Sequence, residues 1–240
     1  MTVRGTLALA AAFGALVLVV LPLDARASRE MHFGLGLLGW AFLAVALAFQ
    51  SRQIRLQVIV LVGVATVLEV IGSLIWRAYS YRLDDLPLFV PPGHGLFYLT
   101  ALRVAALPIL TRHARGIVIA VTAGATGWML LGLARPPLPD LLGFVVWAIF
   151  LRFIFRGRYP LLYSVSFVMT ALLEFYGTGL RVWTWSPVLP VLWLPAGNPP
   201  ACIGAGYAAM DALTRRIVGR IDARRGLSAP SPAPLPPQPA

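Results

Sequence analysis

The chain alternates between long apolar blocks and short polar segments. Each block is close to the roughly 20 residues needed to cross about 30 Å of hydrocarbon as a helix. The blocks cover about residues 5–23, 33–50, 55–76, 93–111, 116–134, 140–156, 159–180 and 199–217. We expect helices, because an isolated strand would leave its backbone polar groups unpaired in lipid. The pattern therefore predicts an all-α, polytopic transmembrane bundle of about eight spans.

Composition excludes a soluble enzyme. Of the 240 residues, 59% are hydrophobic and only 12% are charged, with a mean hydropathy of +0.80. An ordinary soluble domain carries about 25% charged residues. The net charge of +11 comes from arginines at the ends of apolar blocks and not from a basic soluble face. We therefore expect membrane lipid as the partner and no nucleic acid.

The first 27 residues allow two interpretations. Arg4 precedes an uncharged run over 5–23, and Ala25-Arg26-Ala27 matches the small-x-small pattern of a signal-peptidase site. The run is also long enough to be the first span. The sequence is thus consistent with a cleaved signal peptide and with a retained first span.

The arginines are distributed unequally between the two sides of the predicted bundle. One side has thirteen: Arg4, Arg52, Arg55, Arg112, Arg115, Arg152, Arg156, Arg158, Arg215, Arg216, Arg220, Arg224 and Arg225. The other has six: Arg26, Arg29, Arg77, Arg82, Arg135 and Arg181. The positive-inside rule then predicts a multi-pass protein of the inner (cytoplasmic) membrane with both termini in the cytoplasm. The long loops 77–92 and 181–198 would face outward.

The two halves of the chain resemble each other. Glu69-x-x-Gly72, Tyr79-Ser-Tyr81 and Val90-Pro-Pro-Gly-His94 in the first half correspond to three blocks in the second. Those blocks are Glu174-x-x-Gly177, Trp183-Thr-Trp185 and Leu194-Pro-Ala-Gly-Asn198, at offsets of 105 and then 104 residues. We predict two parallel four-span repeats over 1–112 and 113–225, related by an axis along the membrane normal. A disordered, proline-rich cytoplasmic tail is predicted over 226–240.

Four ionisable residues lie within the predicted spans, namely Glu69, Arg103, Glu174 and Asp211. A charge at the bilayer centre costs at least ~2.5 kcal/mol on insertion scales, so such residues usually face a protein interior. A helix rises about 1.5 Å per residue, so Glu69, Glu174 and Arg103 lie roughly 10–13 Å from the outward-facing ends of their predicted spans. We expect these three to form one cluster. Asp211 is expected to pair with Arg215 one turn away.

Two carboxylates and a guanidinium at one level suit acid–base catalysis, because one carboxyl can hold its proton in a low dielectric. A structural ion pair that fixes helix packing is the alternative. His94 and Asn198 occupy equivalent positions at the start of two spans. Asn198, followed by two prolines, resembles an N-cap. His94 could do the same or relay protons to the cluster. The candidate catalytic residues are Glu69, Glu174, Arg103 and His94.

The outward loops are rich in aromatic residues: Trp76, Tyr79, Tyr81, Trp183, Trp185 and Trp193. They can anchor the protein at the membrane interface. Alternatively, Tyr79, Tyr81, Trp183 and Trp185 can stabilise a substrate cation, which makes them, with Asn198, the candidate substrate-binding residues. No histidine or cysteine spacing suggests a metal, and no nucleotide motif is present, so no cofactor is expected.

At Glu69-x-x-Gly72, Tyr79-x-Tyr81 and Val90-Pro91-Pro92 the sequence resembles the integral membrane carotenoid-biosynthesis family that includes carotenoid hydratases. It also resembles membrane proteins of GC-rich bacteria that carry Val-Pro-Pro-Gly-His-Gly and Asn-Pro-Pro. The first resemblance implies a membrane-embedded enzyme that adds water to a terminal isoprenoid double bond. Protonation of such an alkene would give a tertiary carbocation.

Three functions fit these features. The first is a membrane enzyme that hydrates, isomerises or cyclises an isoprenoid or other lipid, with Glu69 and Glu174 as acid and base. The second is a small transporter with a Glu/Arg site near the midplane. The third is a non-catalytic scaffold in which the charges only pack helices. The oligomeric state cannot be derived from the sequence.

Overall fold

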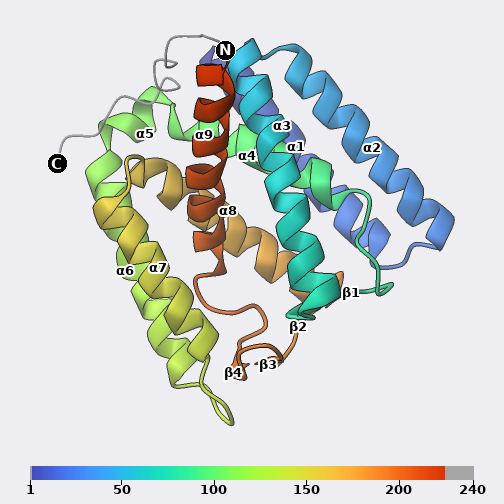
Figure 1. The fold of residues 1–240 in the computed structure, drawn as a ribbon, viewed down its shortest axis with the longest axis vertical. Helices are drawn as coiled ribbons and strands as arrows, with labels where there is room; N and C mark the ends of the chain where they lie inside the picture. Colours follow the sequence, from blue (N-terminus) through green and yellow to red (C-terminus); the bar gives the residue numbers. More distant parts are fainter. Residues whose placement is uncertain (1, 225–240) are drawn as a thin grey trace.

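The computed structural model describes residues 2–224 as a bundle of antiparallel helices (Figure 1). The longer helices are α1 (Val3–Asp24), α2 (Arg29–Ala48), α3 (Arg52–Glu69), α4 (Val90–Ala105), α6 (Ala114–Leu133), α7 (Leu141–Arg156), α8 (Pro160–Gly179) and α9 (Gly206–Arg224). Three short helical segments are η1 (Val70–Ile75), α5 (Pro108–Arg112) and η2 (Ile203–Ala205). The strands are β1 (Tyr79–Tyr81), β2 (Trp183–Trp185), β3 (Val188–Leu189) and β4 (Leu194–Pro195). The predicted all-α class is confirmed.

Five helical segments of the described chain are long and apolar enough to cross a membrane. They are Val3–Asp24, Arg29–Ala48, Arg52–Ile75, Ala114–Leu133 and Pro160–Gly179. A helix also lies at each of the other three predicted spans, but α4 and α7 have only 16 residues each, about 24 Å. The third, α9, carries several charges in 19 residues. The protein thus has the helices of a membrane protein, and the count of eight spans stays a prediction.

The span predicted over 93–111 is interrupted. Leu107 has extended backbone angles (φ −63°, ψ 133°) and Pro108 begins α5. Proline has no N–H and pushes the preceding residue out of the helical region, so α4 ends at Ala105. Helices α2 and α3 begin directly after N-cap serines. Ser28 and Ser51 accept hydrogen bonds from the backbone N–H groups of Met31 and Ile54.

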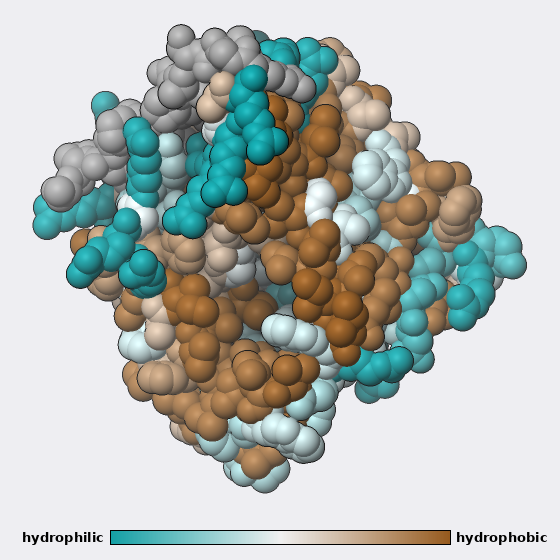
Figure 2. Space-filling model, viewed as in Figure 1, coloured by the Kyte–Doolittle hydropathy of each residue, from teal (hydrophilic) through white to brown (hydrophobic). Residues whose placement is uncertain are grey.

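Helix α4 lies at the centre of the bundle and contacts α1, α2, α3 and α8. Most of its side chains are buried, and Leu96, Leu99 and Ala101 have no exposed surface. Outer helix faces instead expose large apolar side chains, such as Leu18 and Leu131. The face shown in Figure 2 is mostly apolar, with hydrophilic residues gathered at the end where α1 begins and α9 ends and a second group near the start of α2. This is the distribution expected of a bundle surrounded by lipid.

Helix α1 belongs to the folded bundle. It packs against α4 and α2, and Phe13, Leu16, Val17, Val20 and Leu21 line the cavity described below. The proline-rich tail predicted over 226–240 lies outside the described residues.

Asp140 connects the start of α7 to the segment before α9, at the end of the bundle where the strands lie. Its Oδ1 accepts the backbone N–H of Gly143 at 2.8 Å and caps α7, while its Oδ2 accepts that of Ala201 at 2.6 Å. The side chain is buried. We expect Asp140→Ala to cost about 2–4 kcal/mol of unfolding free energy, because it removes a cap and leaves a buried N–H unpaired. Thermal unfolding in detergent measures this.

The matched control is Ser28→Ala, which removes only an exposed cap and should cost about 0.5–1 kcal/mol. Equal losses in the two variants would show that the bond to Ala201 contributes nothing.

Candidate active site

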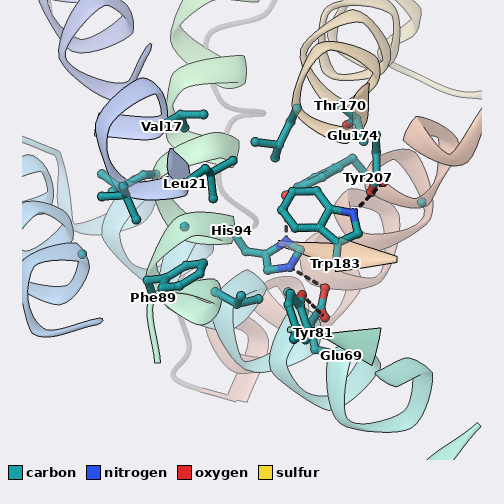
Figure 3. Close-up of a pocket in the computed structure, with 18 of the residues that line it drawn as sticks. Val17, Leu21, Glu69, Tyr81, Phe89, His94, Thr170, Glu174, Trp183 and Tyr207 are labelled. Carbon is teal, nitrogen blue, oxygen red and sulfur yellow. Dashed lines mark hydrogen bonds and ion pairs between the residues drawn. The ribbon is translucent and has the colours of Figure 1, made fainter. Parts of the chain in front are cut away.

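A cavity of about 320 Å³ opens between α1, α2, α3, α4, α8 and α9 and is closed at one end by β1 and β2. Figure 3 shows Val17, Leu21 and Phe89 on one side of it and Glu174, Trp183 and Tyr207 on the other, with His94 between them. Glu69 and Tyr81 lie beside His94. The cavity therefore combines an apolar wall with a group of polar side chains.

Two similar chain reversals build the polar side. After Glu69 the helix widens into the π-helical segment η1, and after Glu174 α8 ends at Gly179. Each helix is followed by an arginine with a left-handed backbone, Arg77 (φ 48°) or Arg181 (φ 59°). Two residues later begin β1 and β2, which pair antiparallel with Ser80 opposite Thr184. The pairing brings the ends of α3/η1 and α8 together, although they are about 100 residues apart in sequence.

Glu69 is held by three side chains. Its Oε2 accepts the hydroxyls of Tyr79 at 2.7 Å and Tyr81 at 2.8 Å, and its Oε1 lies 2.9 Å from Nε2 of His94. Burial beside Glu69 raises the pKa of both tyrosines well above the ordinary phenol value, so they remain protonated donors. Three donors on one carboxyl group favour its carboxylate form.

Glu174 is held by the other strand. Its Oε2 accepts the indole N–H groups of Trp183 at 2.9 Å and Trp185 at 3.0 Å. Its Oε1 makes no hydrogen bond with any described residue, and Glu174 lines the cavity. This oxygen is therefore free to meet a molecule in the cavity.

The four strand aromatics form one wall. Tyr79 packs on Trp185 with ring centroids 4.6 Å apart, and Tyr81 lies 6.3 Å from Trp183. Tyr81, Trp183 and Trp185 are buried, so the interpretation of these three as interfacial anchors is wrong. Their polar atoms are directed to the carboxylates because a buried N–H or O–H needs an acceptor. Trp76 and Trp193 are exposed, as anchors would be.

Each Glu-x-x-Gly motif leaves room for an aromatic ring next to its carboxylate. A Cβ placed on Gly72 would lie 3.1 Å from the Tyr79 ring and hydroxyl, and one on Gly177 would overlap the Trp183 ring. Glycine three residues after glutamate lies on the same helix face. The ring can therefore cross the helix backbone and reach the carboxylate.

Gly177→Ala is expected to displace Trp183 and break its bond to Glu174. Overpacking of this kind costs about 1–3 kcal/mol. Tryptophan fluorescence and near-ultraviolet circular dichroism should change, and the unfolding midpoint should fall. Gly179→Ala is the control, because a Cβ there meets nothing within 4 Å. If the two variants had identical spectra and midpoints, the close approach of Trp183 to α8 would be refuted.

His94 connects two polar groups. It lies within α4, which begins at Val90, so it is not an N-cap. Its Nδ1 lies 2.7 Å from the hydroxyl of Tyr207, and its Nε2 bonds Glu69. Both bonds form together when Nε2–H donates to Glu69 and Nδ1 accepts the Tyr207 proton. The result is a series of hydrogen bonds from Tyr207 through His94 to Glu69, and all three residues line the cavity.

The structure brings Glu69, Glu174 and His94 to one cavity but keeps Arg103 away from it. The prediction that Arg103 joins the cluster is wrong. The predicted depth of Arg103 takes His94 as the outer end of its span, whereas His94 already lies at the level of Glu69. Nine further residues carry Arg103 about 13 Å beyond it, where Nη2 donates to Gln50.

Asn198 does not line the cavity and does not cap a helix. Its side-chain oxygen accepts the backbone N–H of Trp185 at 3.1 Å. The chain then passes Ala201, held by Asp140, and Cys202, with φ 63°, before α9 begins at Gly206. Because Asn198 is used to hold β2, the predicted helix start at 199 is wrong and lies seven residues later.

Sequence reasoning missed Tyr207. It is the only aromatic residue between 199 and 217, and a lone tyrosine in a largely apolar block was the available signal. The predicted pair of Asp211 with Arg215 is confirmed, with Nε of Arg215 at 2.8 and 2.9 Å from the two carboxylate oxygens.

Within the described part of the chain, no group of three histidine, cysteine or acidic residues could hold a metal ion. Comparison with protein-family models, curated proteins and solved structures finds no significant match. What the site can do must therefore be inferred from its own residues.

Proposed function

We propose that the protein is a membrane-embedded enzyme that performs acid–base chemistry on an isoprenoid or other lipid. One observation supports this most directly. Two glutamates, a histidine and a tyrosine converge on a single cavity whose opposite wall is apolar. Such a site can bind an apolar chain and place its reactive end against groups that donate and accept protons.

The substrate class follows from the wall and the surroundings. Side chains of α1 and α2, including Leu16, Val17 and Leu35, line the cavity together with Phe89 and Leu96. Helices α1 and α2 are also long and apolar enough to cross the membrane. A substrate dissolved in the bilayer would therefore find the site among lipid-facing helices, and an apolar chain would replace no hydrogen bonds on entering.

In the proposed reaction Glu174 is the acid and Glu69 the base. Glu174 transfers a proton from Oε1 to one carbon of a substrate double bond, and the neighbouring carbon becomes a tertiary cation. The aromatic wall of Tyr79 and Trp185 stabilises that cation. Water then adds to the cation and yields an alcohol. Its proton passes to the Tyr207 hydroxyl as Tyr207 gives its own proton to Nδ1 of His94, and Nε2 of His94 gives a proton to Glu69. Loss of a proton to Glu69 without water gives the isomerised alkene instead.

The roles are assigned from the hydrogen bonds. Glu69 accepts bonds from Tyr79, Tyr81 and His94 on both oxygens, which suits a carboxylate that receives a proton through the relay. Glu174 has one oxygen without a bond to any described residue, which suits the oxygen that carries the transferred proton. Tyr207 positions His94 and completes the relay.

We also propose that the two halves arose by duplication, with the arginine-rich end in the cytoplasm. Glu69 and Glu174 each bind two aromatic side chains from the strand that follows, and β1 and β2 pair about Ser80 and Thr184 as a two-fold axis would require. The backbone N–H groups of Ala78 and Val182 also bond equivalent glycine carbonyls, at 2.8 and 3.0 Å. The site would then lie at the repeat interface.

Isotope labelling tests the proposed chemistry. Membranes that contain the protein are incubated with apolar lipid extract in D₂O, and the lipids are analysed by mass spectrometry. The proposal expects one carbon-bound deuterium per product molecule, with one oxygen from H₂¹⁸O if the reaction is hydration. Membranes with Glu174→Gln are the control. A lipid pool without label in both samples would contradict an acid–base enzyme and favour the transporter.

A further inference from the structure

A second cavity, of about 640 Å³, lies between the end of α7, the start of α8, α3 and α9. Five arginines line it: Arg152, Arg156, Arg158, Arg215 and Arg216. They come from two segments about 60 residues apart in sequence, and no acidic residue is part of the lining. Figure 1 shows this junction of α7 and α8 beside α9, away from β1 and β2. The positive charges are therefore gathered by the fold around one space.

Little neutralises this charge within the described residues. Asp211 pairs with Arg215, and none of the other four arginines forms an ion pair there. The guanidinium of Arg215 stacks on Tyr159 at 4.2 Å and that of Arg158 lies 5.9 Å from the same ring. Nη2 of Arg215 is buried without a hydrogen-bond partner. Like charges held around one ring repel each other unless an anion joins them.

We infer that this cavity binds a phosphate-bearing anion, either the headgroup of an anionic lipid or a soluble diphosphate. A guanidinium offers a planar pair of N–H donors that matches phosphate oxygens, and several arginines together favour an anion with more than one charge over a single carboxylate. Gln57, Tyr159 and Tyr163 also line the space and can add neutral hydrogen bonds.

This site is separate from the acid–base cavity and does not depend on the proposed function. The two cavities share no lining residue. Gln57, which lines this one, bonds Tyr98, and Tyr98 bonds Asp211. A positive-inside charge bias requires arginines near this end of the bundle, but it does not require them to face a common cavity. The experiment therefore compares arginines that line the cavity with arginines that lie outside it.

The test uses the full chain in a neutral detergent. Inorganic pyrophosphate binding is measured by titration calorimetry, and binding of phosphatidylglycerol against phosphatidylcholine is measured by native mass spectrometry. The variant Arg152→Gln/Arg156→Gln removes two charges from the cavity. Its control, Arg112→Gln/Arg115→Gln, removes two exposed charges outside the lining. Both variants have the same net charge, and their unfolding midpoints are compared first.

We expect the cavity variant to weaken binding by about tenfold or more, and the control to leave it within about twofold. If pyrophosphate binds and shows this loss, the ligand is a soluble phosphate. If only phosphatidylglycerol does, it is a lipid headgroup. Absence of saturable binding of either probe, or equal losses in the two variants, would overturn the inference.

Discussion

Replacement of Glu174 by glutamine is expected to abolish turnover of the lipid substrate. The amide keeps the size of the side chain and can still accept the indole N–H groups of Trp183 and Trp185, whose bonds fix the carboxyl group. It cannot donate a proton to an alkene carbon. General acid catalysis by a positioned group contributes about 10²–10⁴-fold, so the rate should fall by that factor while the unfolding midpoint changes little. Product formation in membranes at matched expression measures it.

Glu30→Gln is the matched control, because Glu30 is an exposed carboxylate on α2 that is not part of the cavity lining. Its activity should equal that of the unmodified protein. Glu69→Gln should lose activity as well, since the His94 relay then ends on a neutral amide. Full activity of the Glu174→Gln protein would remove the acid from the mechanism.

Replacement of Asp211 by asparagine is expected to destabilise the protein by about 3–5 kcal/mol. Asp211 is buried and accepts both a tyrosine hydroxyl, from Tyr98, and the Nε–H of Arg215. Without the carboxylate, the partly buried guanidinium of Arg215 has no opposite charge beside it. Removing one partner of a buried ion pair costs more stability than the intact pair contributes, because the remaining charge stays out of water. Thermal unfolding in detergent reports the loss.

The double variant Asp211→Asn/Arg215→Gln separates this effect from general damage to the core. Since it removes both charges, it should recover part of the stability lost in the single variant. A double variant that loses the sum of both single effects would show that the two residues do not interact.

The positions of the helices follow from the lengths of the apolar blocks, which can be seen in the sequence. Their ends depend on local chemistry that hydropathy does not record. Pro108 ends α4 early, and the side chain of Asn198 serves β2 instead of starting a helix. The apolar block over 93–111 contains Pro108, and a single proline changes a hydropathy average only slightly. Asn198 before two prolines has the sequence pattern of an N-cap, although its side chain binds the backbone of Trp185.

The shared cavity of Glu69 and Glu174 could be predicted, because similar spacing from the helix ends and similar following motifs place both at about one depth. The partners of each carboxylate could not. The sequence predicts Tyr79, Tyr81, Trp183 and Trp185 either as interfacial anchors or as substrate-binding residues, whereas their polar atoms bind the glutamates. Tyr207 is 113 residues from His94, and no local pattern indicates a contact over that distance. Arg103 lies beyond its predicted depth, because α4 begins at Val90 and His94 is already level with Glu69.

The most direct measurement is mass spectrometry of apolar lipid extracts from cells of the source organism that lack the gene. The deletion strain is complemented with the unmodified gene, with Glu69→Gln, with Glu174→Gln or with Glu30→Gln, all at matched expression. The account predicts one lipid whose level is restored by the unmodified gene and by Glu30→Gln but by neither of the other variants, with a mass change that identifies the reaction. Identical lipid profiles in all strains would contradict it.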